Sequence, residues 1–361
     1  MPSRAPPPAD AFASAADEAA HMAARAGLFY VSDSMPGYRR IRAGESFRYL
    51  WPDGRPLKSR REVQRIERLA VPPAYQDVWI CMDPRGHLQA TGRDERGRKQ
   101  YRYHAGWRSV RDDAKFERMV PFAEALPRLR RRLARDLALD GLPREKVLAV
   151  VVSILDATRI RVGNEEYARG NKSFGLTTLR NRHVSFIPGG RAMLNFRGKS
   201  GVPHEVRIDD RRIARIVRHC QELPGQLLFQ YITDDGARAP IDSGQVNLYL
   251  RDVMDDDFTA KDFRTWGATL QAILLLARTP HPETVSDRAF KAEIAAVVAR
   301  VAAELRNTPA VCRKSYINPI VFEAWRSGAL RKFFSGGLKL ALPRLTESRV
   351  VSFLKDYARA P

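Results

Sequence analysis

The fold is decided by residues 184–208, which read VSFIPGGRAMLNFRGKSGVPHEVRI. Two β-favouring runs, residues 184–187 and 192–196, flank the turn Pro188-Gly189-Gly190, and residues 206–208 form a third run. Apolar segments on both sides of a Pro/Gly turn are typical of an antiparallel hairpin. We therefore expect a small three-stranded β-sheet here.

The sequence before and after this predicted sheet has apolar residues at helical spacing. From about Asp112, apolar residues recur at three- and four-residue steps, the period of an amphipathic helix. Residues 143–160 are predicted to form a buried helix, because Pro143 suits a first helical position and residues 147–155 are apolar on nearly every side. Further helices are predicted at residues 211–223, 243–254, 263–277, 289–305 and 348–358.

The N-terminal part has shorter, β-favouring runs at residues 28–31, 47–51 and 78–81, separated by Gly, Pro and Asp turns. One helix is predicted at residues 59–69, where Ser59 can cap the N-terminus.

These patterns predict an α+β chain. It begins with a flexible tail at residues 1–26, which is Pro/Ala-rich and has little to bury. A small β-rich N-terminal domain follows at residues 27–108. A mainly α-helical domain, residues 109–361, contains the three-stranded sheet.

The chain is strongly basic. Its 361 residues include 62 Lys+Arg and 41 Asp+Glu, which gives a formal net charge of +21. A charge of this size favours a polyanionic partner, with nucleic acid ahead of anionic lipid. The alternative is a generally basic surface that serves only solubility. The longest apolar runs are far shorter than the roughly 18 residues of a membrane span, so no membrane partner is predicted.

The cysteines are few and far apart. Cys81, Cys220 and Cys312 form no CxxC pair and no zinc pattern, so we expect reduced thiols. The N-terminus lacks the basic start and apolar centre of a secretory signal. The expected location is the cytoplasm, in association with the nucleoid if the partner is DNA.

Cofactor motifs are missing from the sequence. The absence of GxxxxGK[ST] and GxGxxG argues against nucleotide hydrolysis and dinucleotide binding. The histidines form no HExxH or HxH pattern, and the acidic run Asp255-Asp256-Asp257 is better explained as a solvated helix end. No metal, nucleotide or other cofactor is therefore predicted.

Five polar residues of the helical domain lie at predicted element boundaries: Arg161, Lys199, Arg264, Asn307 and Tyr316. Most have an ordinary explanation when taken alone. An Arg that ends a helix, as expected for Arg161, offsets the helix dipole, a loop Lys is solvated, and most tyrosines are structural. Arg264 differs, because a cation at the start of a helix opposes the dipole and requires a compensating anion.

Six motifs follow one another along the chain. They are Gly97-Arg98-x-Gln100-Tyr101-x-Tyr103, Ile160-Arg161-Val162-Gly163, Gly175-Leu176-Thr177-Thr178-Leu179, Phe196-x-Gly198-Lys199, Lys261-x-x-Arg264-Thr265-Trp266-Gly267, and Asn307-Thr308-Pro309 ahead of Ser315-Tyr316. This ordered set resembles the type IB DNA topoisomerases, and within them the compact bacterial and poxvirus-like branch. The resemblance covers about residues 27–360.

The resemblance implies a C-shaped clamp around double-stranded DNA. The β-rich domain would form one side, and a helical domain with the catalytic fold shared by tyrosine recombinases and type IB topoisomerases would form the other. A monomer of this family relaxes positive and negative supercoils through a transient single-strand break with a 3′-phosphotyrosyl link. It does so without ATP or metal.

The resemblance also implies a role for each polar residue. Tyr316 would be the nucleophile, Arg161 and Arg264 would stabilise the charge of the transition state, and Lys199 would protonate the leaving 5′-oxygen. Asn307 would complete the group that binds the phosphate oxygens. Many family members carry His at that position, whereas Asn can neither be charged nor shuttle a proton.

Residues outside this group are implied to contact DNA. Gln100, Tyr101 and Tyr103 would lie on the strand that enters the major groove, and Tyr167 and Lys261 would contact phosphates near the site.

Two other functions stay open at this point. A tyrosine recombinase shares the Arg, Lys, Arg, Tyr chemistry, but it usually shows HxxR where this chain has Lys261-x-x-Arg264, and it has a helical core-binding domain in place of the β-rich one. A non-catalytic basic protein that coats DNA would leave Tyr316 replaceable without loss of any activity.

Overall fold

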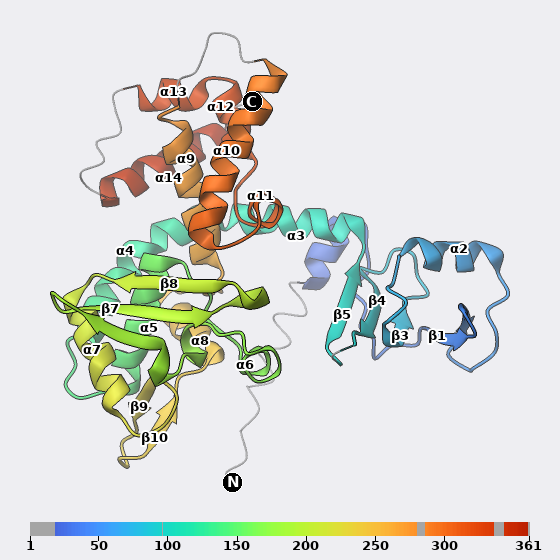
Figure 1. Ribbon diagram of the computed structural model, residues 1–361. Helices are drawn as coiled ribbons and strands as arrows, with labels where there is room; N and C mark the ends of the chain where they lie inside the picture. The colour runs from blue at the N-terminus through green and yellow to red at the C-terminus, as the bar shows by residue number, and fades with distance from the viewer. Residues whose placement is uncertain (1–18, 96, 280–285, 336–342, 360–361) are drawn as a thin grey trace. The chain divides into compact units, whose positions relative to one another are not determined.

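The computed structural model describes residues 19–95, 97–279, 286–335 and 343–359, except for the side chains of 109, 111–113, 166–167, 343–345 and 358–359. The chain divides into two units, Met1–Lys115 and Phe116–Pro361 (Figure 1). The division falls within helix α3 (Ala105–Glu117), seven residues after the domain boundary expected at residue 108. Each unit is therefore described by itself.

The N-terminal unit is built on a five-stranded antiparallel sheet in the order β2-β1-β3-β4-β5. Its strands are β1 (Tyr38–Ala43), β2 (Ser46–Leu50), β3 (Gln76–Ile80), β4 (Leu88–Arg93) and β5 (Lys99–Tyr103). The buried core beneath the sheet consists of Tyr38, Leu57, Ile66, Val78, Ile80 and Ala90. Among the described strands, β5 lies at an edge of the sheet and pairs with β4.

The strands predicted at residues 47–51 and 78–81 are confirmed as β2 and β3. The strand predicted at residues 28–31 is wrong, because Phe29 forms only an isolated bridge with Gly86. The two aromatic side chains of this segment pack on single partners instead of a sheet face. Tyr30 stacks on His87 with ring centroids 4.5 Å apart, and Phe29 lies under the guanidinium of Arg85.

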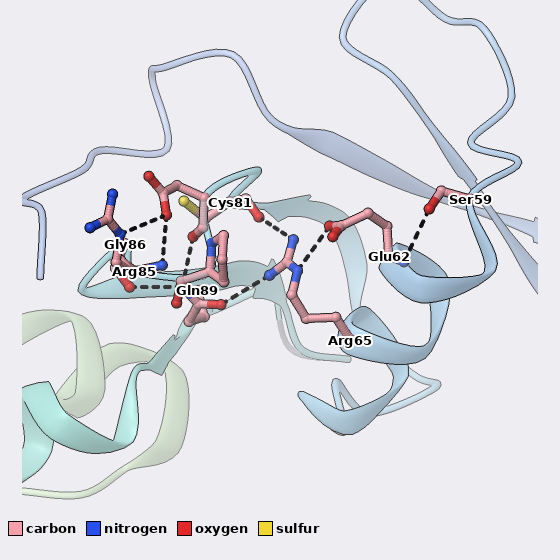
Figure 2. A network of polar contacts seen from close by, with 9 residues as sticks. Ser59, Glu62, Arg65, Cys81, Arg85, Gly86 and Gln89 are labelled. Carbon is pink, nitrogen blue, oxygen red and sulfur yellow. Dashed lines mark hydrogen bonds and ion pairs between the residues drawn. The ribbon is translucent and has the colours of Figure 1, made fainter.

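The predicted helix at residues 59–69 is confirmed as α2 (Arg60–Arg68), and the Ser59 side chain caps it by accepting from the Glu62 amide. Arg65 joins this helix to the sheet (Figure 2). Its guanidinium donates to Glu62 at 2.9 Å, to the Cys81 carbonyl at 2.8 Å and to the Gln89 side chain at 3.1 Å. One cation therefore satisfies acceptors on α2, just after β3 and on β4.

Part of the segment expected to be a tail is ordered. Residues 19–25 are helical, and Ala23 is fully buried against Leu28 and Trp107. Residues 1–18 lie outside the described residues.

The C-terminal unit has one hydrophobic core. Its helices are α4 (Met119–Asp136), α5 (Arg144–Thr158), α6 (Glu165–Asn171), α7 (Arg211–Glu222), α8 (Ser243–Met254), α9 (Asp262–Leu276), α10 (Asp287–Leu305), α11 (Pro309–Ser315), α12 (Ile320–Arg326), α13 (Ala329–Phe334) and α14 (Pro343–Arg359). Helix α9 is buried on nearly every side and packs against α4, α10, α12 and α14. The five helices predicted after the sheet are confirmed as α7, α8, α9, α10 and α14.

The predicted three-stranded sheet is also confirmed, with β7 (Arg191–Arg197) between β6 (Val184–Ile187) and β8 (Pro203–Ile208) (Figure 1). Alternate residues of β7 and β8 point into the core, as strand periodicity requires, and α7 packs across both strands. The short hairpin of β9 (Gln230–Ile232) and β10 (Arg238–Pro240) was not expected.

The end of α5 corrects one expectation. The helix stops at Thr158, and Arg159 adopts a left-handed conformation with φ 56° while its amide bonds to the Leu155 carbonyl. This is a common way to end a helix. Arg161 therefore lies in the segment after the helix instead of ending it. None of the described helices has the length and apolarity needed to span a membrane.

We predict that Arg65→Met lowers the free energy of unfolding by about 1–3 kcal/mol, because it leaves the buried Cys81 carbonyl without a donor. Arg68→Met, an exposed position on the same helix, is the matched control and should leave stability unchanged. Urea denaturation measures both. Equal unfolding midpoints for the two variants would show that the Arg65 network does not stabilise the unit.

Candidate active site

Four of the predicted residues come together in the C-terminal unit. Arg264 lies in the first turn of α9 and is only 3% exposed, and its guanidinium carbon is 5.0 Å from the centroid of the Tyr316 ring. Tyr316 follows directly after α11 and is half-buried. Arg161 donates through Nη2 to Oδ1 of Asn307. We call these four residues the arginine–tyrosine cluster.

The guanidinium of Arg264 is held by the ends of two other helices. Nη2 donates to the Leu305 carbonyl at 3.0 Å, at the end of α10, and Nη1 donates to the carbonyl of Arg159, which caps α5. Carbonyls at helix C-termini carry partial negative charge and lack partners within the helix. They therefore compensate a cation whose own position at the start of α9 is unfavourable.

Gly267 is required for this arrangement. A Cβ at Gly267 would lie 1.9 Å from Nε of Arg159, a distance that real side chains do not reach. The glycine at the end of the Arg264-Thr265-Trp266-Gly267 motif thus lets Arg159 pass close to α9.

The segment that carries Arg161 is held by a pair of glycines, Gly163 and Gly175. The carbonyl of Arg161 accepts from the Leu176 amide at 3.0 Å, and that of Val162 accepts from the Thr177 amide at 2.7 Å. A Cβ on Gly175 would lie 2.5 Å from the backbone nitrogen of Gly163. The two motifs that contain Gly163 and Gly175 are therefore packed backbone to backbone, and this contact positions the Arg161 segment.

Two buried donors in the cluster have no acceptor. Because Oδ1 of Asn307 accepts from Arg161, its Nδ2 is presented as a donor, and this atom has no hydrogen-bond partner among the described residues. Nε of Arg264 is also buried and has no hydrogen-bond partner among the described residues. Unpartnered donors beside two guanidinium groups suit an anion with several oxygens, such as a phosphate.

The charges of the cluster act on one another. Burial and the charge of Arg264 lower the pKa of Arg161. Burial alone would raise the pKa of Tyr316. The charge of Arg264 and its hydrogen bond to the phenol oppose this effect, as do the charges of Arg161 and Lys261, and the net result is a pKa below the usual value. Phenolate is therefore easier to form here than in water.

Thr269 anchors the turn that carries Tyr316. Its hydroxyl donates to the Tyr316 carbonyl at 3.1 Å and accepts from the Asn318 amide at 3.1 Å. The side chain is fully buried on α9, the helix that also carries Arg264. Sequence reasoning missed this residue, because a Thr within an apolar helix has no distinguishing pattern.

Lys199 is carried by a different segment from the four cluster residues. It is exposed in the short 3₁₀ turn η3 (Lys199–Gly201) between β7 and β8, where Ser200 has φ 62°. Within the described residues, no hydrogen bond or ion pair joins Lys199 to the four cluster residues. Lys261 is exposed just before α9, and the side chain of Tyr167 lies outside the described part of the structure.

The predicted DNA-contact residues of the other unit share strand β5. Tyr101 is 48% exposed and stacks on Tyr103 with ring centroids 6.0 Å apart. Gln100 donates to the Asp94 carboxylate at 3.0 Å. The edge of this sheet therefore presents aromatic and amide groups.

Side chains that could bind a metal ion do not form a cluster in the described residues. Across residues 19–359, wherever the structure describes them, no three His, Cys, Asp or Glu side chains lie close enough together to hold a metal ion.

We predict that Thr269→Val lowers the free energy of unfolding by about 1–3 kcal/mol, because a partly buried carbonyl and a partly buried amide lose their partner. Amide hydrogen exchange at Asn318 should become faster. Thr269→Ser keeps the hydroxyl and is the matched control, with Asn318 exchange close to the wild-type rate. Unchanged protection of Asn318 in the Val variant would show that Thr269 does not anchor this turn.

Two family models match the chain. A family model described as the catalytic core of eukaryotic DNA topoisomerase I matches residues 104–324, more than half of the chain. A second model, described as the N-terminal domain of bacterial DNA topoisomerase IB, matches residues 46–94.

Individual relatives carry similar names. The chain is 34% identical over 298 residues to the DNA topoisomerase 1B of Acanthamoeba polyphaga mimivirus, which covers 81% of this chain and 88% of the relative. It is 22% identical over 262 residues to the DNA topoisomerase 1B of Vaccinia virus, strain Copenhagen, covering 69% of this chain and 75% of the relative. Its match to DNA topoisomerase 1 of Schizosaccharomyces pombe is 24% identical over 181 residues and spans 21% of that protein.

Proposed function

Because the chain belongs to the type IB DNA topoisomerases, we propose that it relaxes positive and negative supercoils by cutting one DNA strand, allowing rotation and resealing the cut. The observation that carries this proposal is the position of Tyr316 against the Arg264 guanidinium, beside Arg161 and Asn307. A nucleophile and a set of anion-binding donors occupy one site.

Tyr316 is the proposed nucleophile. Its lowered pKa raises the fraction of phenolate near neutral pH. The phenolate oxygen attacks the phosphorus of a backbone phosphodiester, and the bond from phosphorus to the 5′-oxygen breaks. The product is a 3′-phosphotyrosyl link with a free 5′-hydroxyl, and attack by that hydroxyl reverses the step. The covalent link conserves the phosphodiester energy, so resealing requires no ATP.

Arg161, Arg264 and Asn307 are proposed to bind the non-bridging oxygens. These oxygens gain negative charge in the transition state, where donors that are already in place stabilise them most. Nε of Arg264 and Nδ2 of Asn307 are buried and without acceptors in the described structure. Two guanidinium groups and an amide would supply here the charge stabilisation for which other phosphoryl-transfer enzymes use metal ions.

Lys199 is proposed as the general acid that gives a proton to the leaving 5′-oxygen. It is exposed on the η3 turn, so it would have to reach the cluster when DNA is bound. Positioned proton transfer of this kind contributes on the order of 10²–10⁴ in rate.

The N-terminal unit is proposed to bind the same duplex. Strand β5 is an edge strand whose Tyr101 is exposed, and Gln100, Tyr101 and Tyr103 would contact the major groove and phosphates. Tyr167 and Lys261 are proposed to contact phosphates near the cleavage site. We propose a clamp of the two units around double-stranded DNA, formed by a monomer that works in the cytoplasm on the nucleoid.

A tyrosine recombinase would use similar chemistry, but one observation favours the topoisomerase. Residues 46–94 match the N-terminal domain of bacterial DNA topoisomerase IB, and the structure has a five-stranded β-sheet in this unit.

Plasmid relaxation tests the proposal. With EDTA present and ATP absent, the wild type should relax both negatively and positively supercoiled plasmid, and Tyr316→Phe should lose all relaxation because it lacks the attacking oxygen. Tyr231→Phe, a half-buried tyrosine of β9, is the matched control and should keep the activity. If the wild type retards DNA but leaves supercoils intact, the protein is a DNA-binding protein without this activity.

The pH dependence of single-turnover cleavage tests the activation of Tyr316. The rate should rise with pH as phenolate forms and should level off below pH ~10, the ordinary pKa of tyrosine. Lys261→Gln removes a positive charge that lowers this pKa, so the inflection should move to higher pH. Lys332→Gln, an exposed lysine on α13, is the control and should not move it. A wild-type inflection at or above pH 10 would contradict a lowered pKa.

A further inference from the structure

A second basic site lies beside the cluster, in a cavity of about 740 Å³ in the C-terminal unit. Its walls come from the segment after α6, the 3₁₀ turn before β6, strands β7 and β8, and the end of α10. The basic side chains that line it are Lys172, Arg182, Arg197 and Arg306, together with His183 and His204.

The positive charge of this cavity is not balanced by the protein. Glu205 is the one carboxylate among the lining residues. Arg306 donates to the backbone carbonyl of Glu205, not to its carboxylate. In the part of the chain that the structure describes, none of the four Lys and Arg residues forms an ion pair. A hollow with four cations and one carboxylate attracts an anion.

His204 gives an independent indication of a ligand. Its side chain is 4% exposed and stacks on Phe196 with ring centroids 4.8 Å apart, and neither ring nitrogen has a hydrogen-bond partner among the described residues. Burial and the charges of Arg306, Arg161 and Arg264 lower the pKa of His204 to about 4. The imidazole is therefore neutral near pH 7, and one of its two unpartnered ring nitrogens carries a proton that it can donate.

We propose that this cavity is a phosphate-binding subsite, in which Lys172, Arg182, Arg197, Arg306 and the His204 N–H hold one phosphate group. The proposal rests on the DNA-binding function above and extends it, because the expected source of the group is a backbone phosphate away from the cleaved bond. A free phosphate has the same chemistry, and the experiment below distinguishes the two sources.

The subsite is connected to the catalytic residues on two sides. Gly198, which precedes Lys199, lies so close to His204 that a Cβ there would be 2.4 Å from Nε2. Arg306 precedes Asn307 in the chain and is bonded to β8 through Glu205. A phosphate held in the cavity would therefore contact the base of the Lys199 turn and the segment that carries Asn307. The subsite would thus position both groups when DNA is seated.

The test uses the full chain labelled with ¹⁵N and ¹³C at histidine. The His204 ring signal is identified by its loss in His204→Asn, and inorganic phosphate is then added. We expect a saturable shift of this signal in the wild type. The double variant Arg182→Ala/Arg197→Ala should lose it, because two exposed lining cations are removed. Arg215→Ala, on the outer face of α7, is the matched control and should keep it.

The same titration with a DNA duplex identifies the source of the phosphate. If a backbone phosphate occupies the subsite, a short duplex should shift the His204 signal and prevent any further shift by added phosphate. The double variant should then reduce the slope of log affinity against log salt by about 0.9 for one lost phosphate contact. If DNA leaves the signal unchanged and phosphate still shifts it, the subsite binds free phosphate.

The proposal is overturned if neither ligand shifts His204, or if the double variant responds like Arg215→Ala. Plasmid relaxation by the wild type is read separately, so failure of the subsite and failure of the proposed activity are distinguishable.

Discussion

The C-terminal unit depends on one buried charge, the guanidinium of Arg264. It stands in the first turn of α9, where the helix dipole opposes it, and it is 3% exposed. The carbonyls of Arg159 and Leu305, at the ends of α5 and α10, compensate part of that charge. Because the Tyr316 ring lies against the same guanidinium, this one group sets where two helix ends and the proposed nucleophile meet.

The Arg161–Asn307 hydrogen bond decides what Asn307 can do. Its Oδ1 is occupied by Arg161, and its Nδ2 is a buried donor without a partner in the described structure. An amide donor binds an oxygen well but cannot release or take up a proton. The proposed proton transfer is therefore assigned to another group, Lys199, which is exposed on its own turn. An Asn at this position therefore suits the proposed binding of a phosphate oxygen, and no proton transfer is proposed for it.

Much of the fold could be predicted because burial imposes a period on the sequence. Helices α7 to α10 and the sheet around Pro188-Gly189-Gly190 follow such periods. Strand β1 could not be predicted, because its sequence YRRIRA is rich in charged residues and resembles a solvent-exposed segment. In the structure Arg40 folds back and donates to the carbonyls of Val71 and Tyr75. The cluster was predictable only as an ordered set of motifs, because each cation alone has an ordinary explanation. Thr269 and the His204 cavity had no such pattern, and only the packing of distant segments brings them to the site.

The same positive potential acts on three groups that differ in chemistry. The charges of Arg161 and Arg264 lower the pKa of Tyr316 and contribute to lowering that of His204, and the charge of Arg264 adds to the effect of burial in lowering that of Arg161. A phosphodiester bound by these arginines would offset part of this potential and so would work against the ionisation of Tyr316. The proposed mechanism therefore needs more cations than the bound phosphate neutralises. Lys261 supplies one beside the phenol, and a separate subsite for a second phosphate would leave the charge around Tyr316 uncompensated until the scissile phosphate itself arrives.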